Sequence, residues 1–174
     1  YALQWVVVGT LLALPLTIYT GFFREHAYGL ATQSFGEWSF DQVKELLVEL
    51  VIAPPVIALA YAAVRKTADR WWIWATGGVL VMMLFLMMIA PVFLNPIFND
   101  YKPLRQGEVR EEILSLARAN MIPDDNVVEF DASKQTTRIS ANVSGFLGTT
   151  RVAMNDNLLD RTAPPEMYAV LGHE

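Results

Sequence analysis

Long apolar stretches dominate the first half of the chain. They cover residues 1–23, 46–64 and 71–94, and an α-helix needs roughly 20 such residues to cross a bilayer. Aromatic residues, among them Trp5 and Trp71, stand near the ends of these stretches, where amphipathic rings favour the lipid headgroup layer. The pattern therefore predicts three transmembrane helices.

The residues after 94 follow a pattern that is typical of a soluble domain. Asn95-Pro96 and Lys102-Pro103 predict extended or turning chain, because proline restricts the residue before it. From Gly107 onward, apolar residues recur at spacings of three and four positions. This spacing predicts an amphipathic helix, which Pro123 ends.

Short β-rich runs follow this predicted helix. They cover residues 127–130, 139–146 and 151–154, and residues 148–150 are suited to a turn between the last two. Residues 157–160 predict a short helical turn, and Pro164-Pro165 predicts the start of another helix, since proline is pre-organised for a first helical turn. A helix, a small sheet and a further helix in this order indicate an α+β domain, which we expect to be incomplete.

The charged residues are distributed in agreement with this division. Residues 1–94 contain 11 Lys, Arg, Asp and Glu, whereas residues 95–174 contain 20. The whole chain is 18% charged, below the roughly 25% of soluble proteins, and its mean hydropathy is +0.31. We therefore predict a multi-pass α-helical membrane bundle in residues 1–94, joined to a small α+β domain in residues 95–174.

Composition also excludes several classes of protein. A net charge of −5 and a pI near 5.0 argue against nucleic acid as a partner, because a nucleic-acid binder carries a basic surface. The chain has no cysteine, which excludes a disulfide scaffold, a thiolate zinc site and a cysteine nucleophile.

Basic residues near the membrane predict the topology. Three spans place the loop at 24–45 and the segment after residue 94 on one side, which together hold five such residues. The short loop at 65–70 lies on the other side and holds three. The excess predicts that the soluble part is cytoplasmic, since Lys and Arg favour that side.

His173-Glu174 is the strongest candidate for chemistry in the chain. The pair follows the apolar run 169–172 on the last predicted helix. In a zinc peptidase helix, a histidine and a second histidine four residues later reach one Zn²⁺, and the glutamate after the first takes a proton from water. By itself the dipeptide is also compatible with an ordinary helix surface.

Several blocks of the sequence, in order, resemble the integral-membrane M48 zinc metallopeptidases, in particular the CAAX prenyl protease 1 (Ste24-type) group. The stretch 168–174 is similar to the approach to that family's His-Glu-x-x-His helix. The further blocks that carry the resemblance are residues 23–33, Ala90-Pro91 through Phe98, Pro103-Leu104, 111–117, Ser133-Lys134, Gly145-Phe146, Arg151-Val152 and 156–159.

The resemblance implies a zincin-like soluble domain and a zinc-dependent membrane endopeptidase. It implies that His173 is a zinc ligand and that Glu174 is the general base, with a second histidine and a distal glutamate in sequence beyond residue 174. The 174-residue chain alone is therefore expected to be inactive.

The resemblance also implies a substrate strand. Peptide substrate would add as an extra strand beside Ser140, Ala141, Asn142, Val143 and Ser144. Family members commonly have Asn-Ala-Tyr where this chain has Ser140-Ala141-Asn142, which puts in doubt a side-chain role in holding substrate. An ordinary sheet strand without substrate contact remains an alternative.

The expected partners are the lipid bilayer and a membrane-associated or CAAX-type peptide or membrane-protein substrate. The departure at Ser140 favours a bacterial inner-membrane protein whose substrates are not prenylated. Two alternatives remain: a heat-shock-type M48 quality-control protease, and a non-catalytic membrane scaffold or receptor with a cytosolic α+β module.

Overall fold

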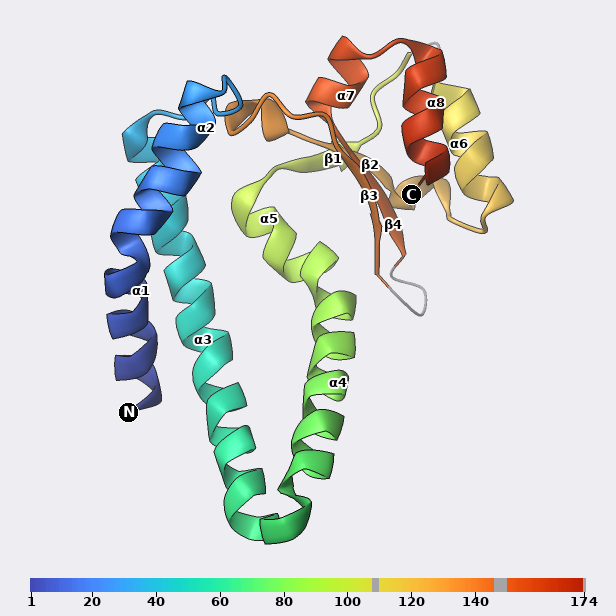
Figure 1. Ribbon diagram of the computed structural model, residues 1–174. Helices are drawn as coiled ribbons and strands as arrows, with labels where there is room; N and C mark the ends of the chain where they lie inside the picture. The colour runs from blue at the N-terminus through green and yellow to red at the C-terminus, as the bar shows by residue number, and fades with distance from the viewer. Residues whose placement is uncertain (108–109, 146–149, 174) are drawn as a thin grey trace. The chain divides into compact units, whose positions relative to one another are not determined.

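The computed structural model describes residues 1–107, 110–145 and 150–173, except for the side chain of Ala68. The chain divides into two compact units (Figure 1). The membrane unit comprises Tyr1–Tyr28 and Gln33–Leu86, and the sheet unit comprises Gly29–Thr32 and Met87–Glu174.

Long helices carry the three apolar stretches. Among the described residues, three helical segments are long and apolar enough to cross a membrane: Ala2–Ala27, Phe35–Thr67 and Trp71–Phe98. Each extends past the predicted stretch into polar sequence on one or both sides, because a helix continues until its backbone hydrogen bonds end, not where its hydropathy falls. The first combines α1 (Ala2–Ile18), the π-helical turn η1 (Tyr19–Phe23) and α2 (Arg24–Ala27). The second is α3 (Phe35–Thr67), and the 3₁₀ turn η2 (Ala68–Arg70) follows it.

Aromatic packing joins the first two spans within the membrane unit, where α1 and α3 lie side by side (Figure 1). The Phe22 ring lies 5.2 Å from Phe35 and 5.9 Å from Trp38, between ring centroids. Trp38 also covers Gly21, at which an added Cβ would stand 3.5 Å from the indole. Glu37 accepts a hydrogen bond from the Ser34 N–H at 2.8 Å, which caps the start of α3.

The third span ends in a proline-rich segment. It runs through α4 (Trp71–Ile89), the π-helical turn η3 (Ala90–Leu94) and α5 (Asn95–Phe98). Asn95-Pro96 is thus helical, and the predicted extended exit at this point is wrong, because proline is tolerated in a first helical turn. Pro96 has no N–H to offer the Pro91 carbonyl five residues earlier, and the Arg151 Nη1 donates to that carbonyl instead, at 2.7 Å.

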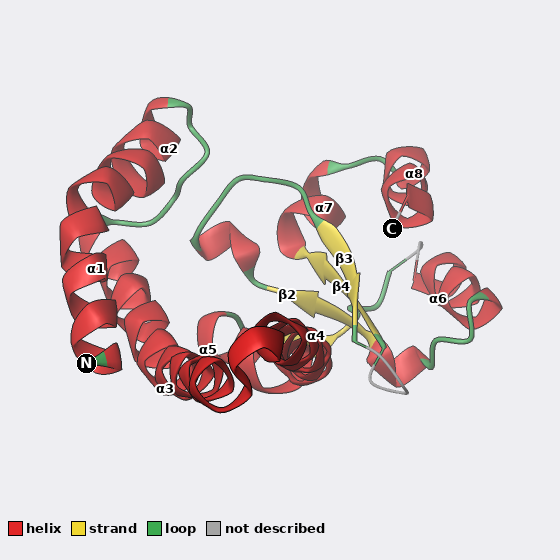
Figure 2. Cartoon of the chain, turned by 60° about the horizontal axis from the view of Figure 1, so that its bottom comes forward, coloured by secondary structure: helices red, strands yellow, loops and turns green. Residues whose placement is uncertain are grey.

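A four-stranded mixed sheet forms the centre of the sheet unit (Figure 2). Its strand order is β1-β2-β4-β3. Its strands are β1 (Tyr101–Pro103), β2 (Val127–Phe130), β3 (Ala141–Ser144) and β4 (Arg151–Asn155). β2 and β4 are parallel, and the other two pairs are antiparallel. The predicted strands at 127–130 and 151–154 are present, whereas the one predicted at 139–146 is shorter and runs from Ala141 to Ser144.

Three helices of the sheet unit pack around one core: α6 (Arg110–Ala119), α7 (Asp156–Arg161) and α8 (Pro164–His173). α6 ends before Pro123, because the chain turns at Met121, whose φ is +60°. The core is formed by the most deeply buried apolar residues of these elements, Ile113, Leu114, Val127, Met154, Leu158 and Met167. The predicted fold class is therefore confirmed, with the differences in single elements given above. The turn predicted at 148–150 lies mostly outside the described residues.

Candidate metal-binding helix and substrate strand

Packing on both sides sets the position of α8. The Ala163 N–H donates to the Glu166 carboxylate at 3.2 Å, which caps the first turn. Met167, one turn further on, is 2% exposed and belongs to the core. The Tyr168 hydroxyl donates to the carboxylate of Glu112 on α6, which raises the pKa of Tyr168 to about 12. These contacts fix the rotation of α8 against the sheet and α6.

His173 is the last residue of α8 and its side chain is exposed. A neutral imidazole is a common zinc ligand, so this side chain has suitable chemistry and is accessible. Among residues 1–107, 110–145 and 150–173, no three His, Cys, Asp or Glu side chains gather closely enough to hold a metal ion. The described part of the chain thus offers one ligand of the right kind and not a whole set. Glu174, the predicted general base, lies outside the described residues.

β3 occupies one end of the sheet and pairs with β4 alone in the described part of the chain. Asn142 and Val143 are exposed, Ala141 is buried in the core, and Ser144 is half-buried. Ser140 directly precedes the strand, and its N–H and carbonyl both bond Asn155. Within residues 1–107, 110–145 and 150–173, the strand predicted to bind substrate thus has one unpaired edge, and an unpaired edge can accept another strand.

β3 and the end of α8 border the same cavity. Its volume is about 240 Å³, and its lining includes Val143 of β3 together with Leu171 and Gly172 of α8. The free edge strand and the turn that carries His173 therefore lie at one place in the sheet unit. The fold thus places Val143 of the predicted substrate strand at the same cavity as Leu171 and Gly172, the two residues before the predicted metal ligand, although about 30 residues separate them in the sequence.

Two buried asparagines that the sequence analysis did not single out hold the segment that leads into β3. Asn155 is 1% exposed, and its Oδ1 accepts from the N–H groups of Ser140 and Leu158 while its Nδ2 donates to the Arg138 carbonyl at 2.7 Å. Asn157 donates to the Thr136 carbonyl at 2.8 Å. The signal in the sequence is Asn155-Asp156-Asn157 directly before Leu158-Leu159, since asparagine is a preferred helix N-cap.

The same segment also bonds the loop between the first two spans. Thr137 N–H donates to the Leu30 carbonyl at 3.0 Å, and Thr32 N–H donates to the Gln135 carbonyl at 3.2 Å. Ala31 and Thr136 form an isolated antiparallel bridge. Residues 29–32 thus belong to the sheet unit, where they order the chain immediately before the candidate substrate strand.

Two family models match the chain. Residues 1–100 match the N-terminal region of CAAX prenyl protease, described as having five membrane helices, and residues 103–174 match peptidase family M48. The first match covers more than half of the chain. The chain therefore belongs to the integral-membrane peptidases of family M48, in the group that contains CAAX prenyl protease 1, as the resemblance indicated.

Individual relatives agree with this assignment. The chain is 30% identical to an uncharacterized metalloprotease, YhfN, of Bacillus subtilis, over 97% of this chain and 39% of the relative. It is 32% identical to CAAX prenyl protease 1 of Saccharomyces cerevisiae, over 96% of this chain and 37% of the relative. The crystal structure of S. mikatae Ste24p matches with a TM-score of 0.86 at 29% identity, covering 99% of this chain and 41% of that structure. The chain thus spans about two fifths of the length of these relatives.

Proposed function

We propose that this chain is the part of a zinc-dependent membrane endopeptidase that supplies the first metal ligand, the general base and the strand that holds the substrate. One observation carries the proposal. The M48 match over residues 103–174 includes α8, where the exposed His173 comes directly after Gly172, and Gly172 lines the cavity that β3 also borders. The M48 match favours a peptidase over a non-catalytic scaffold. The match of residues 1–100 to the CAAX prenyl protease N-terminal region favours that group over a heat-shock-type protease.

In this proposal the chain's own residues bind and orient the peptide. The free edge of β3 offers backbone N–H and carbonyl groups to an extended substrate, which supplies affinity without depending on side-chain identity. His173 would be one ligand of the zinc ion, and Glu174 would accept a proton from the attacking water. When bound, zinc supplies Lewis-acid chemistry that activates water and polarises a carbonyl.

The three candidate spans make the protein an integral membrane protein. We place the sheet unit in the cytoplasm, with the excess of basic residues on that side in support. The Bacillus relative and the Ser140-Ala141-Asn142 departure support a bacterial inner-membrane protein that cleaves membrane-associated peptides without a lipid tail.

The test uses the full-length protein and a pair of substitutions. His173→Ala should lower both the bound zinc and the cleavage of peptides, whereas Glu174→Gln should keep the zinc and lose cleavage by at least 100-fold, the lower end of general acid–base effects. Asp125→Asn, an exposed acid of the sheet unit, is the matched control for charge and should match the unsubstituted enzyme. Full activity of Glu174→Gln would refute the proposed role.

Strand addition and substrate class each have a separate test. Peptides with N-methylated backbone amides should bind more weakly than their unmethylated counterparts if β3 binds the main chain. Peptides of one sequence with and without an isoprenoid tail should be cleaved at similar rates. Strict dependence on the tail would contradict the proposed substrate class but not the peptidase chemistry.

A further inference from the structure

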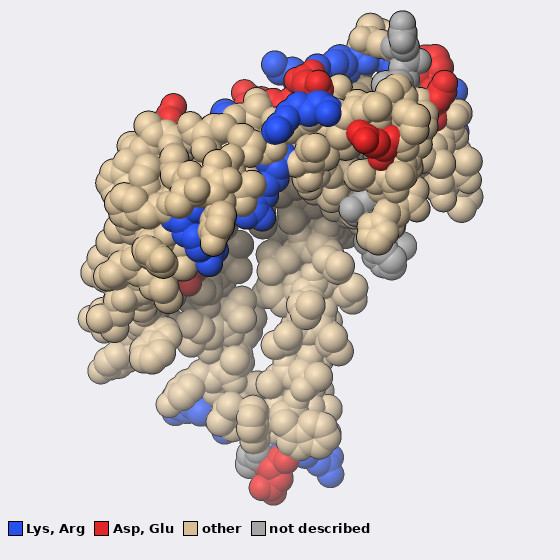
Figure 3. Space-filling view, turned by 45° about the horizontal axis from the view of Figure 1, so that its top comes forward, with Lys and Arg blue, Asp and Glu red and all other residues tan. Residues whose placement is uncertain are grey.

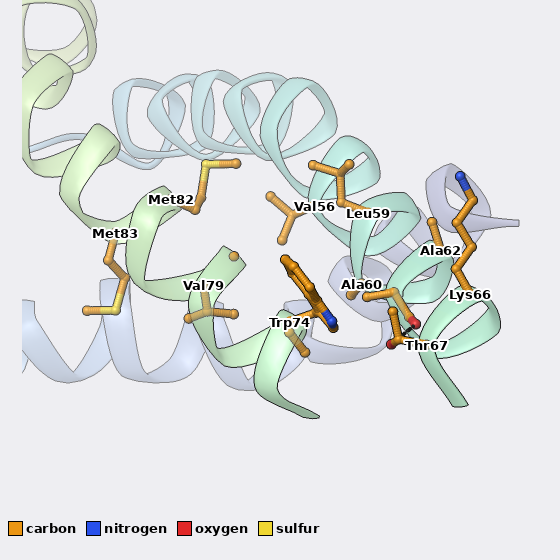
Figure 4. Close-up of a pocket in the computed structure, with 13 residues that line it drawn as sticks. Val56, Leu59, Ala60, Ala62, Lys66, Thr67, Trp74, Val79, Met82 and Met83 are labelled. Atoms are coloured by element: carbon orange, nitrogen blue, oxygen red, sulfur yellow. Dashed lines mark hydrogen bonds between the residues drawn. The ribbon is translucent and has the colours of Figure 1, made fainter. Parts of the chain in front are cut away.

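An apolar cavity lies between α3 and α4 inside the membrane unit (Figure 4). Its volume is about 430 Å³, within the roughly 300–1,000 Å³ of small-molecule sites. Small residues of both helices, such as Ala60, Ala75 and Gly78, are part of its lining, and their short side chains leave the space unfilled. Figure 4 shows Trp74 between the two helices, with Val56 and Met82 beyond it.

The two ends of the cavity differ in polarity. Away from the α3–α4 turn the lining is aliphatic or thioether, from Val56, Val79 and Met83. At the turn the lining includes Lys66 and Thr67, and the Thr67 hydroxyl already donates to the Ala63 carbonyl at 2.6 Å. Lys66 is exposed and has no hydrogen-bond or ion-pair partner within the described ranges. In Figure 4 its amine extends away from the apolar part.

The turn itself is basic and aromatic. It contains Arg65, Lys66 and Arg70 against one acid, Asp69, and three tryptophans follow at Trp71, Trp72 and Trp74. Tryptophan and long basic side chains favour the membrane–water interface, where phospholipid headgroups lie. Figure 3 shows charged side chains at the end of this helical hairpin and few along the helices themselves. The polar end of the cavity is therefore at headgroup depth and carries positive charge.

We propose that this cavity binds one acyl chain of an anionic phospholipid, whose headgroup pairs with Lys66. Along α3 the lining runs from Val56 to Thr67, about 16 Å at 1.5 Å per residue. An extended hydrocarbon chain can lie along an apolar space of that length, and it leaves the charge of Lys66 for the headgroup. This proposal does not depend on the peptidase function.

The experiment measures lipid retained by the purified full-length protein, by native mass spectrometry. The probes are phosphatidylglycerol and phosphatidylcholine with identical acyl chains. We expect one phosphatidylglycerol per protein, retained about fivefold more strongly than phosphatidylcholine, which corresponds to about 1 kcal/mol for one lysine near an anionic surface. Equal retention of the two lipids would overturn the proposed role of charge.

Two matched pairs of variants locate the site. Gly78→Leu fills the cavity and should lower lipid retention at least tenfold, whereas Gly77→Leu, at a position that does not line the cavity, should leave it unchanged. An added Cβ meets no atom within 4 Å at either glycine, so both variants should fold. Lys66→Ala should remove the preference for phosphatidylglycerol, whereas Arg65→Ala, which removes the same charge from the same turn, should keep it.

Three results would overturn the proposal. One is full lipid retention by Gly78→Leu, or by Ala75→Leu if the first variant folds poorly. Another is a wild-type preference for phosphatidylglycerol in Lys66→Ala. The third is a photoreactive residue at position 78 that cross-links to another segment of the protein and not to lipid, which would show that a helix occupies the cavity.

Discussion

The membrane unit and the sheet unit place the same kinds of side chain in opposite positions. In the membrane unit, large apolar residues such as Leu12 (78% exposed) and Val51 (72% exposed) lie on the surface. In the sheet unit, Ile113 and Met154 are 2% and 0% exposed. The difference reflects the solvent: lipid accepts apolar surface and water does not. Burial therefore contributes strongly to the stability of the sheet unit, while the spans depend on backbone hydrogen bonds and specific contacts.

Truncation of an apolar side chain should separate the two units most clearly. Leu158→Ala removes a fully buried side chain of the sheet core and should destabilise the protein by about 2–5 kcal/mol. Leu80→Ala, on the exposed surface of α4, should change stability by less than about 1 kcal/mol because no cavity forms. Thermal unfolding of the full-length protein measures the stability of both variants. Similar losses of stability in Leu158→Ala and Leu80→Ala would contradict the difference between the two units.

The next largest effect concerns the buried polar groups of the sheet unit. Asn155→Ala leaves the N–H groups of Ser140 and Leu158 without their partner and removes one of the donors to the Arg138 carbonyl, to which Asn157 also donates. We expect a loss of about 2–3 kcal/mol, since an unsatisfied buried group costs about 1–3 kcal/mol and water can reach the exposed residues. Asn142→Ala, at an exposed position of β3, is the control and should be neutral in the same unfolding measurement. A neutral Asn155→Ala would show that the segment before β3 is held by other contacts.

A smaller effect is expected where a span meets the sheet inside the sheet unit. Arg151→Met removes the donor to the Pro91 carbonyl and the cation above the Tyr101 ring, 4.4 Å from its centroid. The loss should be about 1–2 kcal/mol, because a hydrogen bond from a charged group is worth slightly more than a neutral one. Arg151→Lys keeps the charge without the guanidinium geometry and should recover part of the stability. Equal stability of Arg151→Met and the unsubstituted protein would contradict this role.

The smallest effect is a pH dependence at the α6–α8 contact. Hydrogen bonding to Glu112 raises the pKa of Tyr168 to about 12, so the folded state favours the neutral phenol. This contribution to stability is fully present below pH 10, the ordinary tyrosine pKa, and is lost as the pH rises towards 12. An ultraviolet absorbance titration should show a late-titrating tyrosine that is absent in Tyr168→Phe and shifted to lower pH in Glu112→Gln. An unchanged titration in Glu112→Gln would remove the proposed cause.

Local pattern predicted most of the elements, because their causes are local. The length of the apolar stretches predicted three spans, and β-branched runs predicted β2 and β4. β1 escaped prediction because Tyr101–Pro103 is too short to show alternation. The prediction of extended chain at Asn95-Pro96 was wrong because this proline, a residue that often ends regular structure, lies in the first turn of α5. The Pro91 carbonyl that Pro96 leaves without a donor is bonded by Arg151, 60 positions away.

The candidate site divides in the same way. The sequence alone determined the residue types: an imidazole and a carboxylate in succession near the end of an apolar helix, and a run with strand character around Ala141. Tertiary structure decided that β3 is the edge strand and borders the same cavity as Leu171 and Gly172, because strand order depends on long-range pairing and not on local spacing. Tertiary structure also decided that Asn155 holds the segment before β3 and that Lys66 stands at the polar end of the α3–α4 cavity. The surroundings of a polar side chain depend on which segments the fold brings together.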